Sequence, residues 1–494
     1  MPRPQTERWQ WAALALAAMA PRVAGAILRR PWHDEYFTAW VSKLPLADLV
    51  AALRLDSGPP LPYLLVKLLA TLGIEPLAAA RTISVAAGTA AVLLAAQAAR
   101  RAFGDRAGWW TGALVAVHPL AVAWSCEGRA YALVLLAAAW AWERMEALAH
   151  GEGGAVGLAS ALALAGWSHA LGMVLAVAAV AVALLLPRPA RDRAVAAVAA
   201  GLASQIPWLP VAVHQPAAAI AWMAGAWQTL TLVGKIAAPV RLLSPLGGFA
   251  AFLDLASAPA WVEVVGASLV LALLGAACSG ACPVRRPLVG FLLPAAVLGG
   301  LVALGVPVLY PGRAEAISLV PFLVLLGAGA SGRRPSRVVA AAVVLSAAAV
   351  TAASLLLWAG QPASSEQRLA AALRAGLPGG GVVVIGGYWR LGIAYHLGRD
   401  RTVFDLANYP TSAQAHPGWY DPQVDRPAPG ELDRLLVELR PQVRRTAVVV
   451  APGMATASDL QRLADALGLS PRLAVPGARL LVPRARPGDR SGPG

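Results

Sequence analysis

Apolar runs of about membrane-spanning length recur from Trp9 to Leu357, separated by short loops that contain Arg, Pro and Gly. A hydrocarbon core of about 30 Å requires roughly 20 apolar residues per helical crossing. The first run is predicted to be a signal anchor and not a cleaved signal peptide, because it is long enough to span and no small-residue cleavage site precedes Arg29. We predict eleven spans, at about residues 9–28, 77–99, 109–125, 130–148, 155–167, 169–186, 194–212, 261–282, 287–309, 314–330 and 338–358.

The pattern changes after Trp358, where polar residues become frequent and residues 361–366 have the composition of a linker. Valine-rich runs at 382–385 and 447–450 predict buried strands, and helices are expected near 366–375, 389–397, 431–439 and 457–467. The fold class is therefore an α-helical polytopic membrane domain over residues 1–360 followed by a small soluble α/β domain over 361–494. The tail from Arg484 is expected to be disordered. Either recognition of an acceptor or partner, or structural packing alone, agrees with the sequence of the second domain.

Composition supports this division and excludes some functions. The chain of 494 residues is 58% hydrophobic and 14% charged, whereas soluble domains carry roughly 25% charged residues. Its net charge of +15 does not indicate nucleic-acid binding, because the basic residues are spread over many loops. No nucleotide-binding motif supports an ATP-driven pump. Membrane lipids are the expected surroundings.

Arginine positions predict the orientation, since short cytoplasmic loops are enriched in basic residues. With the N-terminus in the cytoplasm, the basic loops at 100–106, 188–193, 285–286 and 333–337 all lie inside. The loop at 29–75, the stretch at about 213–260 and everything after Trp358 then lie outside a cell (inner or plasma) membrane. Within the second of these regions, residues 224–252 suit either a partly helical loop over a site or packing at the bilayer interface.

The candidate chemistry lies at the outer membrane edge, where charged groups are costly unless they are paired or functional. Asp34 and Glu35 stand in the first outer loop, and Asp56 stands near the end of that loop. Adjacent helical residues point about 100° apart, so the two acids cannot act on one atom in the same way. The alternative for Asp34 is a helix cap, with a helix that begins near Tyr36.

A second candidate is the outer turn at residues 124–133, in which Glu127 and Arg129 are two residues apart. A guanidinium group suits a phosphate, and Glu127 can hold it in place. A purely structural ion pair or a lipid-headgroup contact is the alternative. Other basic residues on the outer side include Arg81 and Arg313, which an anionic ligand would explain.

Four ordered elements resemble glycosyltransferase family 39 of the GT-C membrane enzymes, which includes protein O-mannosyltransferases and the aminoarabinose transferase of lipid A. They are the acidic pair at 34–35, the PPLPY run at 59–63, the ARTIS run at 80–84 leading to residues 101–108, and the SCEGRAY run at 125–131, which resembles the family's S-Q-E-A-R-x-Y. The resemblance covers about residues 9–190. A departure is Gly58, where many relatives have His or Lys.

The resemblance implies roles for individual residues. It points to Asp34 as the acid essential for transfer, with Glu35 supporting the geometry of the site. It implies that Arg129 and Glu127 meet the phosphate of a lipid-linked donor. His169 resembles a T-H-Y-x-G element, although a lone histidine is more often structural. Tyr131 belongs to the same motif as Arg129 and is a further site candidate.

The expected partners are a polyprenyl-phosphate sugar and a protein, glycan or lipid acceptor. We expect a single, inverting displacement in which Asp34 accepts the proton of the acceptor hydroxyl, while Arg129, with Arg81 or Arg313, stabilises the leaving phosphate. The sequence requires no cofactor, and nothing in it supports a divalent metal. Two alternatives are a transporter or flippase of a lipid-linked intermediate, and a non-catalytic receptor or scaffold; neither explains acids and arginines at the outer edge.

Overall fold

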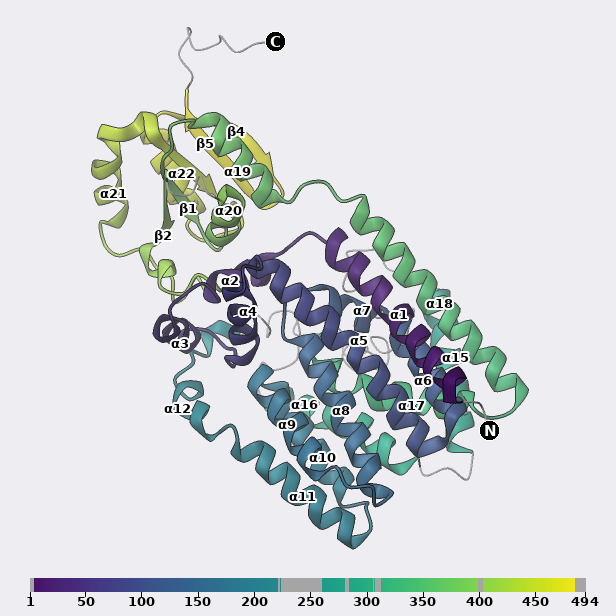
Figure 1. Cartoon of the computed structure of the whole chain (residues 1–494). Coiled ribbons are helices and arrows are strands. Elements are labelled where there is room, and N and C mark those ends of the chain that lie inside the picture. The colour runs from purple at the N-terminus through teal and green to yellow at the C-terminus, as the bar shows by residue number, and fades with distance from the viewer. Residues whose placement is uncertain are drawn as a thin grey trace. The chain divides into compact units, whose positions relative to one another are not determined.

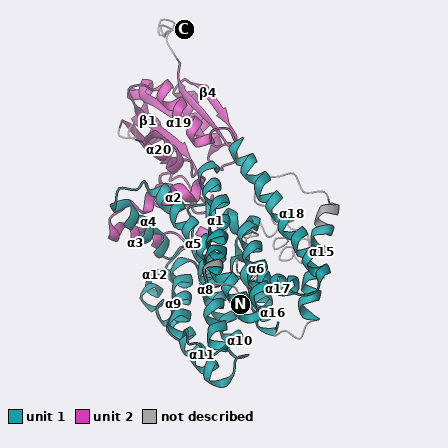
Figure 2. Cartoon of the chain, turned by 45° about the vertical axis from the view of Figure 1, so that its right-hand side comes forward, with its two compact units in different colours: residues 1–29, 57–215, 220–360 teal, residues 30–56, 216–219, 361–494 magenta. Residues whose placement is uncertain are grey.

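A computed structural model describes residues 4–220, 223, 260–279, 284–304, 306, 312–398 and 403–484. The chain forms two compact units (Figure 2). The helical unit comprises residues 1–29, 57–215 and 220–360, and the α/β unit comprises residues 30–56, 216–219 and 361–494. The two units divide at residue 360, and residues 30–56 of the predicted first outer loop belong to the same unit as the C-terminal residues.

The helices of the helical unit include at least one in each predicted span (Figure 1). They are α1 (Pro4–Leu28), α4 (Leu61–Thr71), α5 (Pro76–Phe103), α6 (Asp105–Val117), α7 (Pro119–Cys126), α8 (Tyr131–Ala149), α9 (Ala155–Ser168), α10 (Leu171–Ala183), α11 (Arg188–Ala203), η1 (Ile206–Trp208), α12 (Leu209–Ala212), α15 (Ala260–Cys278), α16 (Arg285–Ala303), η2 (Ala314–Ile317), α17 (Leu319–Ala330) and α18 (Arg334–Ala359).

Among the described residues, four segments are long and apolar enough to cross a membrane: Glu7–Leu28, Pro76–Phe103, Arg188–Ala212 and Arg334–Ala359. Shorter apolar helices include Leu61–Thr71. The number of eleven spans therefore stays a prediction.

Helix α5 packs against α1, α6 and α8. Its buried face is made largely of alanines together with Gly88. Small residues let helix backbones approach closely, and this is how helices associate when lipid removes the hydrophobic driving force between them. The alanine-rich composition of the chain thus serves close packing as well as membrane insertion.

The predicted span at 109–125 is interrupted, because α6 ends at Val117 and α7 begins at Pro119. His118 between them is extended, with φ −64° and ψ 124°. Proline lacks the N–H that would continue the helix and disfavours helical geometry in the residue before it. Residues 109–125 therefore belong to two helices.

Two carboxylates of α8 are buried among apolar residues, and each binds an arginine from another helix. Glu143 accepts a hydrogen bond from Arg101 Nε at 3.0 Å. Glu146 accepts two from Arg286, at 3.0 and 2.6 Å. A bidentate arginine offsets much of the cost of burying a carboxylate, so these pairs join α5, α8 and α16.

The predicted α/β domain is confirmed, and its described sheet has the strand order β2-β1-β3-β5-β4. Strands β2, β1 and β3 are parallel, while β5 is antiparallel to both β3 and β4. The predicted strands are β1 and β3, whereas β2, β4 and β5 were missed. The strands are β1 (Gly381–Gly386), β2 (Phe404–Tyr409), β3 (Thr446–Val450), β4 (Leu469–Val475) and β5 (Ala478–Pro483).

Helices cover both faces of this sheet. Helix α19 (Ser365–Gly376) and α20 (Arg390–Leu397) bury Leu369, Leu373 and Ile393 in one apolar cluster. The other cluster contains Leu439 and Leu460, from α21 (Glu431–Leu439) and α22 (Ala457–Ala466). The short helices η4 (Thr411–Gln414) and η5 (Arg440–Arg445) complete this part of the chain.

The predicted first outer loop contains helices of its own. Helices α2 (His33–Val41) and α3 (Leu46–Arg54) belong to the α/β unit, while α4 belongs to the helical unit. The proposed loop over the site at 224–252 and the tail at 485–494 lie outside the described residues.

The close contact of α16 with α8 leads to a prediction. A Cβ atom on Gly290 would lie 1.9 Å from the Trp142 ring, whereas no described atom lies within 4 Å of a Cβ on Gly299 of the same helix. Overpacking typically costs about 1–3 kcal/mol. We expect Gly290→Ala to lower the thermal midpoint in detergent, while Gly299→Ala leaves it unchanged or slightly higher. Equal midpoints for the two variants would contradict the described packing.

Candidate active site

Four of the predicted site residues come together in the helical unit. Tyr131 begins α8, His169 separates α9 from α10, and Arg313 precedes η2. The Arg313 guanidinium lies over the Tyr131 ring at 5.5 Å from its centroid, and the His169 ring is centred 5.3 Å from that of Tyr131. Arg129 and Arg313 both interact electrostatically with His169. We call these four residues the arginine cluster.

The turns that carry the two arginines are tied to neighbouring elements. Trp124 Nε1 of α7 donates a hydrogen bond to the Gly312 carbonyl at 2.8 Å, next to Arg313. Ser84 Oγ of α5 donates to the Arg129 carbonyl at 3.4 Å. Two guanidinium groups held near an imidazole, in a partly desolvated setting, favour an anion with several oxygen atoms.

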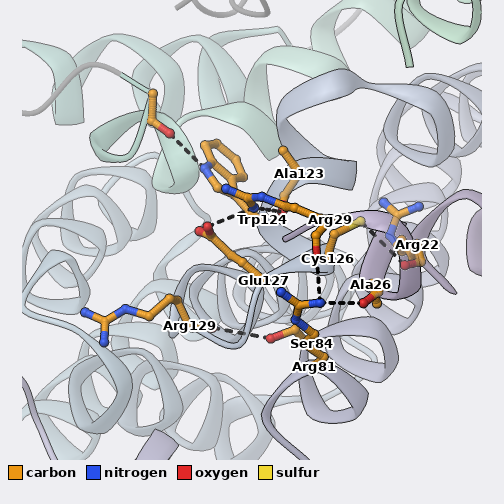
Figure 3. A network of polar contacts seen from close by, with 11 residues as sticks. Arg22, Ala26, Arg29, Arg81, Ser84, Ala123, Trp124, Cys126, Glu127 and Arg129 are labelled. Atoms are coloured by element: carbon orange, nitrogen blue, oxygen red, sulfur yellow. Dashed lines mark hydrogen bonds and ion pairs between the residues drawn. The ribbon is translucent and has the colours of Figure 1, made fainter. Parts of the chain in front are cut away.

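Glu127 forms an ion pair with Arg29, for which the sequence predicted no partner. Arg29 Nη1 lies 2.9 Å from Glu127 Oε2, and the Glu127 side chain is 1% exposed. The Arg29 guanidinium also lies 5.6 Å from the centroid of the Trp358 ring. In Figure 3 the side chain of Arg129 points away from this pair. The pair therefore joins the end of α1 to the turn that precedes Arg129.

Arg81 donates to backbone groups at the end of α1. Its Nη1 atom binds the carbonyls of Ala26 at 2.7 Å and Arg29 at 2.9 Å (Figure 3). The last carbonyls of a helix have no partner within the helix. A basic side chain there donates hydrogen bonds to them and interacts favourably with the helix dipole. These contacts give Arg81 a structural function; its binding of a donor phosphate stays a prediction.

The break between α6 and α7 leaves carbonyl groups that the helix cannot satisfy, and Arg22 of α1 binds two of them. Its Nη1 and Nη2 atoms donate to Ala116 at 2.9 Å and Val115 at 3.1 Å. Thr351 Oγ1 of α18 donates to the Val117 carbonyl at 2.8 Å. Arg22 is completely buried, so these acceptors stabilise its charge in place of water.

Arg22 also reaches the motif that contains the candidate site. Its Nε atom donates to Ser125 Oγ at 3.2 Å. Helix α7 can approach its neighbours closely because Gly88 and Gly25 have no side chain. A Cβ on Gly88 would lie 1.9 Å from Ser125 Oγ, and a Cβ on Gly25 would lie 2.3 Å from Cys126 Sγ. Sequence reasoning missed Arg22, although a charged residue in the middle of an apolar run was the signal.

Glu315 of η2 was also missed. It is 7% exposed, and its Oε2 atom has no hydrogen-bond partner within the described part of the chain. The signal was a carboxylate two residues after Arg313 at the start of an apolar run.

The acidic pair lies in the α/β unit, at the first turn of α2. Asp34 is half-buried and Glu35 is completely buried, in agreement with the prediction that adjacent helical residues face different directions. The residue at the N-cap position is Trp32, and the helix begins at His33. The alternative in which Asp34 caps a helix beginning near Tyr36 was therefore wrong, and Asp34 stands inside the first turn.

Other predicted positions have local structural explanations. Asp56 follows α3 and is half-exposed. The Gly58 carbonyl accepts a hydrogen bond from Gln215 Nε2 at 3.1 Å, and a Cβ on Gly58 would lie 3.1 Å from the Tyr63 hydroxyl. A larger residue at 58, such as the His or Lys of relatives, would require Tyr63 to shift. The described residues contain no group of three or more His, Cys, Asp or Glu that could hold a metal ion.

The chain is similar to known proteins in part of its sequence and in its fold. Residues 57–214 match a family model described as dolichyl-phosphate-mannose-protein mannosyltransferase. No curated protein sequence matches the chain. The arabinofuranosyltransferase AftD from mycobacteria matches with a TM-score of 0.50 at 13% identity, over 96% of this chain and 41% of AftD. ArnT from Cupriavidus metallidurans, bound to undecaprenyl phosphate, matches with a TM-score of 0.48 at 15% identity, over 97% and 98% of the two chains. An Archaeoglobus fulgidus oligosaccharyltransferase matches with a TM-score of 0.47 at 11% identity, over 94% and 72%.

The fold is similar to that of AftD, and the family-model match over residues 57–214 confirms the predicted resemblance to the GT-C membrane glycosyltransferases. Within that class, the matching family model is that of the protein mannosyltransferases. The matched region contains Arg81, Glu127, Arg129, Tyr131 and His169 and does not extend to Asp34, Glu35 or Arg313.

The position of Arg22 leads to a prediction. Arg22→Met keeps a long side chain but removes every donor to Val115, Ala116 and Ser125, and each buried acceptor left unbound costs about 1–3 kcal/mol. We expect a marked loss of thermal stability and of folded yield in detergent. Arg54→Met, at an exposed arginine of α3, is the control and should change stability by less than about 0.5 kcal/mol. Wild-type stability of Arg22→Met would show that the carbonyls at the helix break do not need this residue.

Proposed function

We propose that this chain is a membrane glycosyltransferase that transfers a sugar from a polyprenyl-phosphate donor to an acceptor hydroxyl on the extracytoplasmic side. The observation that carries the proposal is the arginine cluster, in which Arg129 and Arg313 lie near Tyr131 and His169. The family-model match over residues 57–214 supports the reaction class.

The arginine cluster is proposed to bind the donor phosphate. A guanidinium group donates in a fixed fork that matches two phosphate oxygens, and its charge is permanent. Negative charge grows on the bridging oxygen as the bond to the sugar breaks, so cations fixed in advance stabilise the transition state more than the ground state. The ion pair of Glu127 with Arg29 supports this role indirectly, because it fixes the turn that carries Arg129.

Asp34 is proposed to be the general base. The acceptor oxygen forms a bond to the anomeric carbon while its proton moves to the Asp34 carboxylate. The bond from the anomeric carbon to the phosphate oxygen breaks, and its electron pair leaves with the polyprenyl phosphate. One displacement inverts the configuration at the anomeric carbon. The half-buried position of Asp34 leaves it accessible to an acceptor, whereas buried Glu35 is proposed to support the geometry of α2.

The proposed orientation has the N-terminus in the cytoplasm and the α/β unit outside. Residues 30–56 and 361–494 form one compact unit, and one compact unit cannot lie on both sides of a bilayer. Ten of the eleven predicted spans separate these two segments. An even number of spans returns the chain to the same side of the membrane, so both segments can belong to the α/β unit.

The first test concerns the base. Asp34→Asn keeps the size of the side chain but removes the proton acceptor, and general-base help is worth roughly 100- to 10,000-fold in rate. We expect normal expression and membrane insertion with severe loss of sugar transfer, measured with purified protein, a polyprenyl-phosphate sugar and a candidate acceptor. Asp48→Asn, at an exposed acid in the first turn of α3 in the same unit, is the matched control. Near-normal turnover by Asp34→Asn would defeat the proposed base even if transfer itself were established.

The second test concerns the donor phosphate. Arg129→Ala removes both charge and fork, while Arg129→Lys keeps the charge and loses the fork. We expect kcat/KM for the donor to fall about ten- to hundredfold in Arg129→Ala and by a smaller factor in Arg129→Lys, because a hydrogen bond to a charged group is worth about 1.5–3 kcal/mol. Unchanged kcat/KM in both variants would remove Arg129 from the donor site.

A further inference from the structure

The helix that carries the acidic pair is packed into the C-terminal part of the α/β unit. Tyr36, Phe37 and Val41 of α2 are at most 3% exposed, and α2 contacts α20. Two glycines make room for the aromatic rings. A Cβ on Gly418 would lie 2.8 Å from the Phe37 ring, and a Cβ on Gly392 would lie 2.9 Å from the Tyr36 ring.

Polar contacts fix the rotation of α2 about its own axis. The Tyr36 hydroxyl and His396 Nε2 lie 2.8 Å apart. One turn earlier, His33 Nε2 lies 2.9 Å from the Gly418 carbonyl, and its ring is centred 4.9 Å from that of Tyr388. Tyr36 directly follows Glu35, so a contact at Tyr36 determines where both acids point.

The segment around α2 is attached at both of its ends as well. Arg30 Nη2 donates to the Gln361 carbonyl at 3.1 Å. Trp419 Nε1 donates to the Leu55 carbonyl at 2.8 Å. Residues 30–56 are therefore held at the beginning, at α2 and at the end by residues after 360.

The loop that supplies Gly418 and Trp419 is itself rigidly built. The His416 and Trp419 rings stack with centroids 3.7 Å apart and an interplanar angle of 10°. His416 Nε2 lies 3.0 Å from Asp425 Oδ1, and Asp425 is 1% exposed. A loop fixed by stacking and by a buried carboxylate can act as a firm support for α2.

We propose that the α/β unit is the positioning device for the acidic pair, with Tyr36 and His396 as the positioning residues. This inference rests on the proposed function, because it takes Asp34 as the base. Catalytic groups must be held to within about 0.5 Å and 10–20°. A side chain on a nine-residue helix of an outer loop has no such precision alone, and the contacts with α20 and the loop at 416–425 supply it.

The protonation states agree with this contact. Burial, and then the Arg374 charge, lower the pKa of His396, so its imidazole is neutral at neutral pH. Burial also raises the pKa of Tyr36, so its hydroxyl keeps its proton, and the contact joins two neutral groups. The Arg374 guanidinium donates to the His396 carbonyl at 2.7 Å, which holds the end of α20 in place.

The test compares two variants that each remove one buried hydroxyl from the same unit. Tyr36→Phe removes the partner of His396, whereas Tyr409→Phe removes the partner of Asp459, whose Oδ2 lies 3.1 Å from the Tyr409 hydroxyl. In the full-length protein we expect Tyr36→Phe to lower kcat about three- to tenfold with an unchanged KM for the polyprenyl-phosphate sugar. Tyr409→Phe should stay within about twofold of wild type.

A double-mutant cycle tests whether the two positioning residues act through one contact. His396→Leu should lower kcat to a similar extent, and the double variant with Tyr36→Phe should lose no more than the stronger single variant. Hydrogen exchange adds a readout that does not need activity. Amides of residues 33–41 should exchange faster in Tyr36→Phe than in wild type or Tyr409→Phe.

The outcomes separate this inference from the proposed function. A wild-type protein active in transfer, with equal kcat and equal exchange at 33–41 in Tyr36→Phe and Tyr409→Phe, would overturn the positioning role. A wild-type protein without transfer activity on any polyprenyl-phosphate sugar would overturn the proposed function. Hydrogen exchange would then still decide whether Tyr36 holds α2.

Discussion

The helix break at His118 and Pro119 is the constraint on which the helical unit depends. Proline cannot donate to the turn before it, so the last carbonyls of α6 need donors from elsewhere in an apolar environment. Arg22 and Thr351 supply those donors. Because Arg22 also binds Ser125, the same guanidinium that satisfies the break fixes α7. The turn that carries Glu127 and Arg129 follows α7 directly. The position of the candidate site therefore depends on the hydrogen bonds that Arg22 and Thr351 donate to the carbonyls at the helix break.

The arginine cluster and the acidic pair are supported by different means. Around the cluster, ion pairs and hydrogen bonds to carbonyls hold the ends of several helices, and Arg29 and Arg81 act together at the end of α1. The acidic pair is supported instead by aromatic rings and a half-buried histidine from residues after 360. Rigid support is what both binding a phosphate and removing a proton require, since small displacements of catalytic groups reduce rates strongly.

The sequence pattern predicted the helices and strands that are determined by residues close together in the chain. Apolar runs located the helices, and valine-rich segments located β1 and β3. Strand β2 was missed because its sequence FDLANY mixes polar and apolar residues, and β4 contains Pro471 and Arg472. The motif at 125–131 pointed to residues that do cluster, but the Arg29 partner of Glu127 and the Arg22 contacts join residues about a hundred positions apart. The folding of residues 30–56 with the C-terminal residues involves still longer separations, which periodicity cannot reveal.

The proposed reaction consumes a lipid-linked sugar by transfer, whereas a transporter would only bind and move it. The most direct measurement uses the purified full-length protein in proteoliposomes with an isotopically labelled polyprenyl-phosphate sugar and a panel of hydroxyl acceptors. Mass spectrometry follows the donor, the free polyprenyl phosphate and the acceptor. We expect polyprenyl phosphate to appear in a one-to-one ratio with glycosylated acceptor, and NMR to show the inverted anomeric configuration in the product. Movement of intact donor between the two leaflets, with no polyprenyl phosphate released, would contradict the account and favour a flippase.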